Sequence, residues 1–323
     1  MLLKAVTQIS RVLVGVLFVY AGFVKLVDPI GSQYKFEEYF SKSVLNIEFL
    51  TPYALAFSIL LIIAELVLGI MLLVGYKPKF TVRSLFFINL FFLFLTWYSY
   101  TYNKVTDCGC FGDAIKLSPE ETFYKNLIFM GLIVILIWGL KHIKPILSAR
   151  LAAWVSLIAV VISLFIANYV LKHLPFIDFR AYAVGTDIAE NMIYKGDGEI
   201  PPIHDFMIET EQGDQLNTML SKSKALLIVM YSFEKANKKA VKPIAELAKK
   251  ASNKGYEIYI LTASYIEDVE AAQKKYRLPY AFGFCDETTL KTMVRANPGI
   301  ITVEKGIIGG KWNWIDTKKV ILK

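Results

Sequence analysis

The chain has 323 residues, of which 55% are hydrophobic, and its formal net charge is +8. Apolar residues are concentrated in the first half, which excludes a wholly soluble protein and predicts an integral membrane protein. The charge divides into +5 for residues 1–171 (14 basic, 9 acidic) and +3 for residues 172–323 (22 basic, 19 acidic). Because the second half is so mixed in sign, we expect no nucleic-acid partner.

Five apolar runs are each long enough to cross the hydrocarbon core, which takes about 20 helical residues. They are residues 9–27, 53–74, 82–102, 123–140 and 152–171. None alternates with period two, which favours helices over barrel strands. We therefore predict a four-helix membrane domain over 1–145, a fifth helix over 146–172, a connector over 173–200 and an α/β domain over 201–323.

The distribution of basic residues predicts the orientation of these helices. Cytoplasmic loops retain positive charge, and one side of the predicted membrane carries basic residues without acidic ones, namely Lys4, Arg11, Lys77, Lys79, Arg83, Lys141, Lys144 and Arg150. The amino terminus is thus predicted to be cytoplasmic, and five spans then place the last domain in the periplasm, outside a bacterial inner membrane. The first run is too long for a signal peptide and no small-residue cleavage site follows it, so we expect it to be retained.

Three ionisable residues stand in or beside the predicted spans. Glu65 lies near the middle of the second run, where a carboxyl is costly and faces the bundle interior. It is a candidate for a proton relay or a quinone site, and equally for a hydrogen bond to Asn89, Thr96 or another span. Lys25 and Asp28 mark the outer end of the first run, as an interfacial ion pair or as snorkelling anchors.

The stretch TDCGCFGDA places Cys108 and Cys110 in a short loop between the third and fourth runs. A disulfide across one intervening residue closes a small strained ring, and strained, exposed disulfides exchange readily. The pair is therefore a candidate for thiol–disulfide exchange. The alternatives are thiols that only pack, a disulfide that stiffens a turn, and a metal site, for which three cysteines and three histidines are thin support.

Three stretches carry a family resemblance: RVLVGVLFVYAGFVKLVDPIG in the first run, AELVLGIMLLVG in the second and CGCFG after the third. Their order resembles that of the DoxX-like and MauE-like four-helix membrane proteins, over roughly residues 9–140. The resemblance implies periplasmic or thiol redox chemistry, or the maturation of partner proteins. By architectural analogy with quinone-linked disulfide-forming bundles, quinone is the candidate cofactor.

After the fifth run the sequence has the pattern of an α/β domain. ALLIVMYSF and YEIYILTAS are predicted buried strands, and a short strand is expected at 281–284. ANKKAVKPIAELAKKASNKG and IEDVEAAQKKYR are predicted helices, the first kinked at Pro243 and ended by Gly255. GIITVEKGIIGGKWNW predicts a hairpin that turns at Lys305 and Gly306. The predicted fold class is an all-α membrane bundle followed by an α/β domain with a mixed sheet.

This second domain is similar to the thioredoxin superfamily, in particular its TlpA-like and peroxiredoxin-like branch. NPGIITVEKG matches the segment that carries the cis-proline, so the resemblance implies a peptide-binding groove beside Asn297 and Pro298. The family's Cys-x-x-Cys corresponds to Lys235 and Lys238, which implies a degenerate domain without thiol chemistry. Cys285 is expected to be a small core residue.

Two functions follow from these patterns. In the first, an inner-membrane protein of a Gram-negative, Bacteroidota-like envelope cycles Cys108 and Cys110 between dithiol and disulfide, as a thiol–disulfide oxidoreductase would, while the outer domain binds a client. In the second, the chain is a non-enzymatic scaffold whose bundle docks a membrane partner and whose outer domain binds a periplasmic one. The Cys-Gly-Cys favours the first, and the missing Cys-x-x-Cys favours the second.

Overall fold

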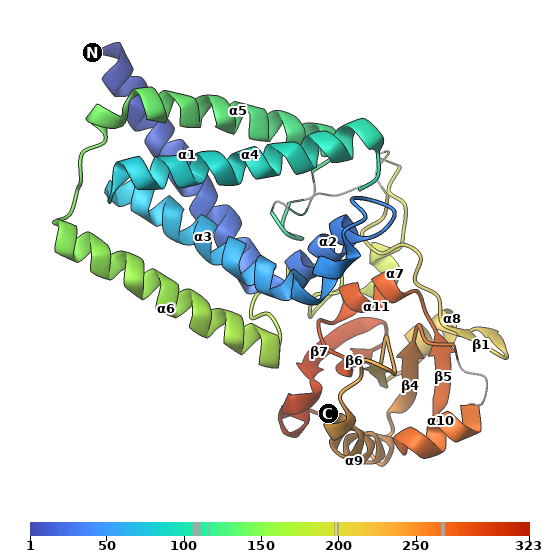
Figure 1. The fold of residues 1–323 in the computed structure, drawn as a ribbon. Coiled ribbons are helices and arrows are strands. Elements are labelled where there is room, and N and C mark those ends of the chain that lie inside the picture. The colour runs from blue at the N-terminus through green and yellow to red at the C-terminus, as the bar shows by residue number, and fades with distance from the viewer. Residues whose placement is uncertain (106–108, 110, 116, 197, 199, 266–268) are drawn as a thin grey trace. The chain divides into compact units, whose positions relative to one another are not determined.

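The fold comes from a computed structural model that describes residues 1–105, 109, 111–115, 117–196, 198, 200–265 and 269–323 (Figure 1). The chain forms two compact units, Met1–Leu171 and Lys172–Lys323, which we call the membrane unit and the sheet unit. The predicted fold class is confirmed: five long apolar helices are followed by a mixed α/β sheet.

The membrane unit contains the five predicted spans and two additional short helical segments between the first and second. The long helices are α1 (Leu2–Val27), α3 (Ala54–Val74), α4 (Pro78–Tyr102), α5 (Pro119–Trp138) and α6 (Ala149–His173), whose last two residues belong to the sheet unit. The short ones are α2 (Pro29–Phe40) and η1 (Glu48–Tyr53), and η2 (Leu140–His142) follows α5. Because α1 and α3–α6 alternate in direction, residues 28–53 lie at the same end of the bundle as the last residues of α4 and the first residues of α5 (Figure 1).

Close packing of α1 against α3 rests on glycines. A side-chain carbon at Gly22 would lie 2.9 Å from the backbone nitrogen of Leu66, and one at Gly69 would lie 2.9 Å from the carbonyl oxygen of Gly15. Small residues at such positions let membrane helices approach closely, because apolar burial alone does not drive association in lipid. The glycine contacts therefore fix how α1 lies along α3.

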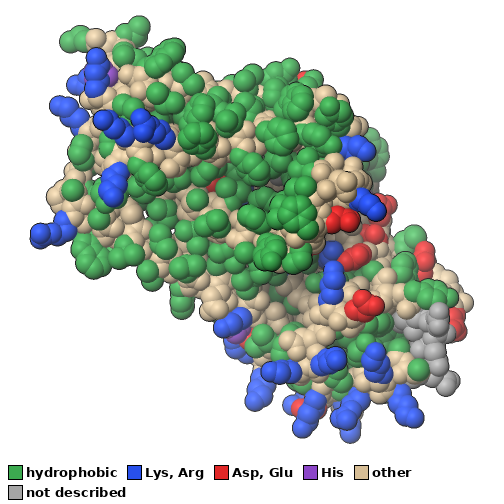
Figure 2. All heavy atoms as spheres, in the orientation of Figure 1, with side chains coloured by type: hydrophobic (Ala, Val, Ile, Leu, Met, Phe, Trp, Pro, Cys, Tyr) green, Lys and Arg blue, Asp and Glu red, His purple; other side chains and the backbone are tan. Residues whose placement is uncertain are grey.

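The outer faces of the long helices are apolar. Figure 2 shows hydrophobic side chains covering the visible face of the helical part, with basic side chains near one end. On α6 the exposed residues are large, such as Trp154 and Phe165, whereas the buried ones are mostly small: Ala152, Ser156, Ser163, Ala167 and Val170. This division is the one expected for a helix that packs on a bundle with one face and contacts lipid with the other.

The end of the bundle opposite the Cys-Gly-Cys loop is held by Arg11. Its guanidinium is buried and donates hydrogen bonds to the carbonyl oxygens of Leu72 (2.9 Å), Leu73 (2.7 Å) and Lys144 (3.1 Å). The last carbonyls of a helix have no partner within the helix, so this side chain satisfies the end of α3 and ties it to α1.

The sheet unit is built on one mixed sheet with the strand order β2-β1-β5-β4-β3-β6-β7 among the described residues. The strands are β1 (Glu209–Thr210), β2 (Gly213–Asp214), β3 (Ala225–Val229), β4 (Glu257–Thr262), β5 (Ala281–Phe284), β6 (Gly299–Glu304) and β7 (Ile307–Asn313). β3, β4 and β5 are parallel, whereas β6 runs antiparallel to β3 and forms the predicted hairpin with β7.

Helices cover both faces of this sheet. One core contains residues of α7 (Ile188–Asn191), α8 (Leu216–Ser221) and α11 (Glu287–Met293). The other contains residues of η3 (Lys238–Ala240), α9 (Val241–Ser252), α10 (Val269–Tyr276) and η4 (Trp314–Lys319). The central strand β3 is buried along its whole length and contributes to both cores.

Two local expectations differ from the structure. A kink was expected at Pro243, but α9 begins at Val241, so the proline lies in the first turn, where a backbone N–H has no partner within the helix. A connector was expected over 173–200, but Arg180, Tyr182 and Ile188 of this segment are buried within the sheet unit. The segment therefore packs as part of the unit.

Candidate functional site

The predicted cysteine pair itself lies outside the described residues, but the residue between the two cysteines does not. Gly109 has a φ of +63°, in the left-handed region that suits glycine. A side-chain carbon at this position would lie 2.9 Å from Cγ of Lys35 in α2. The backbone of Gly109 therefore lies directly against α2.

A buried ion pair joins the first two membrane helices. Nζ of Lys25 in α1 lies 2.7 Å from both Oε1 and Oε2 of Glu65 in α3, and the two side chains are 7% and 1% exposed. Because Gly22 and Leu66 pack closely one turn away, the helices are near enough for this short bidentate contact. Glu65 thus faces the bundle interior, as a carboxyl at this depth must.

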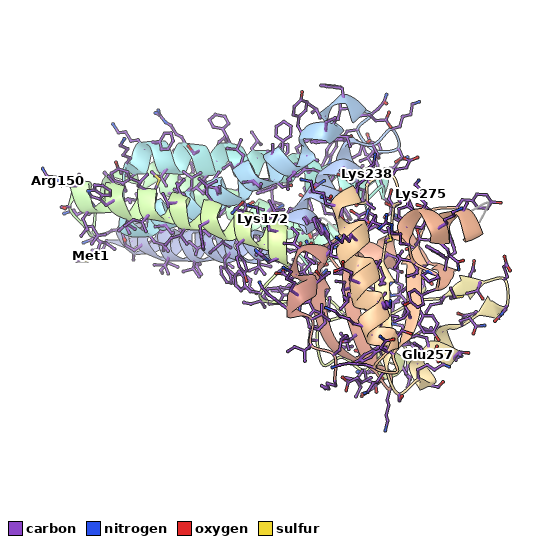
Figure 3. The ribbon with its side chains drawn as sticks, turned by 90° about the horizontal axis from the view of Figure 1, so that it is seen from below. Met1, Arg150, Lys172, Lys238, Glu257 and Lys275 are labelled. Atoms are coloured by element: carbon purple, nitrogen blue, oxygen red, sulfur yellow. The ribbon has the colours of Figure 1, made fainter. Side chains whose placement is uncertain are left out.

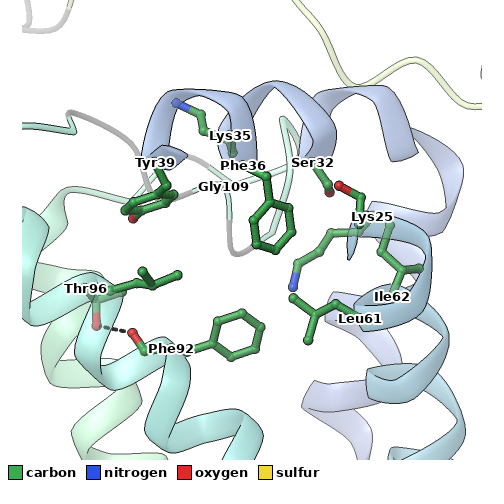
Figure 4. A pocket seen from close by; sticks show the side chains of 12 residues that line it. Lys25, Ser32, Lys35, Phe36, Tyr39, Leu61, Ile62, Phe92, Thr96 and Gly109 are labelled. Atoms are coloured by element: carbon green, nitrogen blue, oxygen red, sulfur yellow. Dashed lines mark hydrogen bonds between the residues drawn. The ribbon is translucent and has the colours of Figure 1, made fainter. Parts of the chain in front are cut away.

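A small pocket lies beside the ion pair, between α1, α2, α3 and α4 (Figure 4). Its apolar walls are Phe36, Leu61, Ile62, Phe92 and Leu95, and its polar groups are Lys25, Ser32, Lys35, Tyr39, Ser58 and Thr96. Gly109 also lines the pocket. The pocket is therefore lined both by the buried Lys25 and by Gly109, the described residue between the two cysteines.

The ammonium of Lys25 points into this pocket. In Figure 4 it lies among Phe36, Leu61 and Phe92, and it stands 5.0 Å from the ring centroid of Phe92. An ammonium has three N–H donors, and Glu65 accepts from two directions. The ammonium therefore makes a cation–π contact with Phe92 in addition to its ion pair with Glu65.

The remaining intramembrane candidates have other roles. Asp28 is the N-cap of α2 and accepts a hydrogen bond from the N–H of Gly31 at 3.1 Å. Asn89 donates to the carbonyl oxygen of Asn126 (3.0 Å), and Asn126 donates to Oγ1 of Thr96 (3.3 Å). Asn89 and Thr96 therefore link α4 to α5, and the partner of Glu65 comes from α1.

Sequence reasoning missed the helix that covers this pocket. α2 supplies Ser32, Lys35, Phe36 and Tyr39, and the hydroxyl of Tyr39 is 3.0 Å from that of Ser99 in α4. The signal was present, because Asp28 followed by a proline at the first helical position is a typical helix start. The segment is nevertheless only twelve residues long, too short for a membrane span, so the search for spans did not identify it as a helix.

The structure also fixes the predicted positions in the sheet unit. The Asn297–Pro298 peptide bond is cis, and the side-chain amide of Asn297 donates to the carbonyl oxygen of Ser232 at 2.7 Å. Lys235 and Lys238 lie between β3 and α9 and are exposed. Cys285 is buried, and this burial raises the pKa of its thiol to about 12, so it is unreactive at neutral pH.

Within the described part of the chain, His, Cys, Asp and Glu form no cluster of three or more that could hold a metal ion. The pocket in the membrane unit measures about 50 Å³, far below the roughly 300–1,000 Å³ of small-molecule sites. A quinone ring has the aromatic walls and the donor that it needs there, but it does not fit this volume. We therefore derive no step through a quinone.

Comparison with known proteins gives one match. Residues 3–139 match the family described as methylamine utilisation protein MauE. No curated protein and no solved structure matches the chain. The match extends from α1 to the end of α5 and leaves α6 and the sheet unit outside it. The first four membrane helices are therefore the part of the chain that is similar to the MauE family.

Proposed function

We propose that the chain is an inner-membrane protein of thiol redox chemistry, in which Cys108 and Cys110 exchange a disulfide with a periplasmic client. The observation that carries this proposal is the place of Gly109. The residue between the two cysteines lines a pocket that is also lined by Lys25, whose ammonium forms a buried ion pair with Glu65. Buried charges are costly in a membrane, and a loop with a purely structural role would not require them nearby.

The exchange balances without a further reagent. A thiolate of the client attacks one sulfur of the Cys108–Cys110 disulfide, which forms a mixed disulfide and releases the other cysteine as a thiolate. The second client thiolate then attacks the mixed disulfide, so the client is oxidised and the loop is reduced to a dithiol. Two electrons and two protons pass from the client to the loop.

Lys35 supports this chemistry by its charge. Its side-chain carbons contact Gly109, and its ammonium is paired with Glu38 at 3.0 Å. A cation next to a cysteine favours the thiolate, which is both the nucleophile and the better leaving group. We propose that Lys35 and Lys25 give the loop the positive surroundings that exchange needs.

The sheet unit is proposed to be a degenerate thioredoxin-like domain that presents the client. The parallel β3, β4 and β5, the antiparallel β6–β7 hairpin and the cis-proline before β6 support this assignment. Lys235 and Lys238 stand where that fold carries its thiols, so binding rather than exchange is the role proposed for this unit. Asn297 and Pro298 are its proposed peptide-binding residues.

The proposal is tested by trapping thiols in intact membranes with acid and an alkylating mass tag. We expect Cys108 and Cys110 to be oxidised at rest, to be reduced by a brief dithiothreitol pulse and to reoxidise when oxidised glutathione is added after washout. Cys285→Ser serves as the background control, because Cys285 is the one other cysteine of the sequence. A pair that stays reduced, or that is oxidised and inert, contradicts the proposal.

A scaffold without redox activity is the second candidate, and the lysines at the thiol positions of the sheet unit favour it. Replacing both loop cysteines by serine distinguishes the two functions. Unchanged capture of the periplasmic and membrane partners, together with unchanged cellular function, would establish the scaffold.

A further inference from the structure

A second and larger pocket lies in the sheet unit, on the face covered by α9 and α10. It measures about 320 Å³, which is within the usual range of small-molecule sites. Its inner walls are formed by residues that are themselves buried: Met230, Ala240, Ile244, Tyr276, Leu278 and Pro298. Protein interiors are otherwise close-packed, so an apolar hollow of this size stands out.

The walls of this pocket are held rigidly. Phe233 stacks on Tyr276 with ring centroids 4.7 Å apart and an interplanar angle of 21°, and it meets Phe282 edge-on at 5.8 Å. One wall is formed by the loop between β3 and α9, which the hydrogen bond from Asn297 to Ser232 fixes to the segment before β6. The hollow is therefore built from packed aromatic and aliphatic groups.

The mouth of the pocket is polar and carries more positive than negative charge. Its exposed lining residues are Glu234, Asn237, Lys238 and Lys275, and Figure 3 shows Lys238 at the start of α9 with Lys275 nearby. The surroundings are more basic still, with Lys235, Lys239, Lys242, Lys274 and Arg277 close in sequence. Figure 2 shows basic side chains gathered over the region of α9 and α10.

We propose that this pocket binds a small organic acid, whose apolar body enters the hollow and whose carboxylate lies between Lys238 and Lys275. The volume lies near the lower end of the roughly 300–1,000 Å³ of small-molecule sites, which suits a small ligand. Apolar walls recognise the body, and the two ammonium groups select an anion over a neutral compound. This ligand site is additional to the thiol exchange proposed for the membrane unit, and it shares Pro298 with the peptide-binding residues proposed for the sheet unit.

The test uses the full chain in lipid nanodiscs and two water-soluble probes, 3-phenylpropionate and its uncharged amide, each of about the size that the volume admits. Saturation-transfer NMR titration should show saturable binding of the acid, with a Kd on the order of 1 mM or below. The amide should bind more weakly. Absence of saturable binding of the acid would overturn the proposal.

Three variants locate the binding. Lys238→Gln with Lys275→Gln should weaken binding of the acid about threefold to tenfold and leave binding of the amide unchanged. Lys249→Gln with Lys250→Gln makes the same charge change on exposed residues of α9 outside the pocket lining, and it should leave both probes unchanged. Ala236 lines the pocket, so Ala236→Leu should reduce its volume and weaken binding of both probes.

Equal losses of affinity for the acid in the two double lysine variants would show that the acid responds to the general positive charge of the surface and not to a site. This result would refute the proposal. So would a phenylalanine-containing acidic peptide that binds when the acid does not. The thiol-trapping experiment concerns only Cys108 and Cys110, so either idea can fail without the other.

Discussion

The Lys25–Glu65 pair should respond very differently to single and double replacement. Both charges are almost fully buried and hydrogen-bonded to each other at 2.7 Å, so removing one leaves the other unpaired in a medium that solvates it poorly. We expect Lys25→Met or Glu65→Leu alone to lower the free energy of unfolding by about 3–5 kcal/mol. For a unit of this size, that corresponds to a decrease in Tm of roughly 6–20 °C.

The double variant, Lys25→Met with Glu65→Leu, removes both charges and replaces them with apolar groups of similar volume. It should be more stable than either single variant and close to the wild type, because replacing a whole buried ion pair is often neutral or stabilising. Thermal unfolding in nanodiscs, followed by intrinsic fluorescence, measures all three variants. Lys42→Met with Glu48→Leu, at two exposed positions, is the matched control.

Additive losses in the double variant would refute this reasoning, since they would mean that each side chain is stabilised independently of the other. Single variants as stable as the wild type would also refute it. Such a result would place both charges in contact with water and not in the bundle interior.

Three further predictions follow from the described contacts. Burial, together with Arg180, lowers the pKa of Lys311 to about 7 despite its 2.6 Å contact with Asp178. Between pH 7 and about 10 the unfolded chain therefore binds more protons than the folded chain does. The sheet unit should accordingly gain stability as the pH rises through this range. Lys311→Met should remove that slope, and a slope that persists in the variant would assign it to other groups. Arg11→Gln should cost about 1–3 kcal/mol of membrane-unit stability, because carbonyl oxygens at the end of α3 lose their donors; an unchanged Tm would contradict this role. Gly22→Val should also lower the Tm of the membrane unit by forcing α1 away from Leu66. Gly131→Val should not lower it, because a side-chain carbon added at Gly131 would have no neighbouring atom within 4 Å.

The sequence predicts the elements well where one local pattern determines them. β5 was expected at 281–284 and spans Ala281–Phe284, and the hairpin turn falls at Lys305 and Gly306 as expected. Both depend on short-range signals, namely a buried apolar run and a turn with Gly306 at a φ of +81°. Tertiary packing confirms these signals but is not needed to recognise them.

The candidate site could be predicted only in part, because its contacts join distant segments. The cost of a carboxyl in the membrane predicts that Glu65 faces inward, but its partner depends on how α1 lies along α3. That alignment is set by the approach of Gly22 to Leu66, which no periodicity in either helix encodes. The pocket needs α2 as well, which folds back over the bundle and brings Lys35 to Gly109.

The energetics of the ion pair favour a functional site over a device for packing alone. An apolar pair would join α1 to α3 at no desolvation cost, so a buried lysine and glutamate are expensive for that purpose. This desolvation cost is explained if Lys25 also interacts with a group in the adjoining pocket, into which its ammonium points. The pocket wall also includes Gly109, the residue between the two cysteines. In the function that we propose, this charge serves the exchange at Cys108 and Cys110, because a cation beside a cysteine favours the thiolate over the thiol.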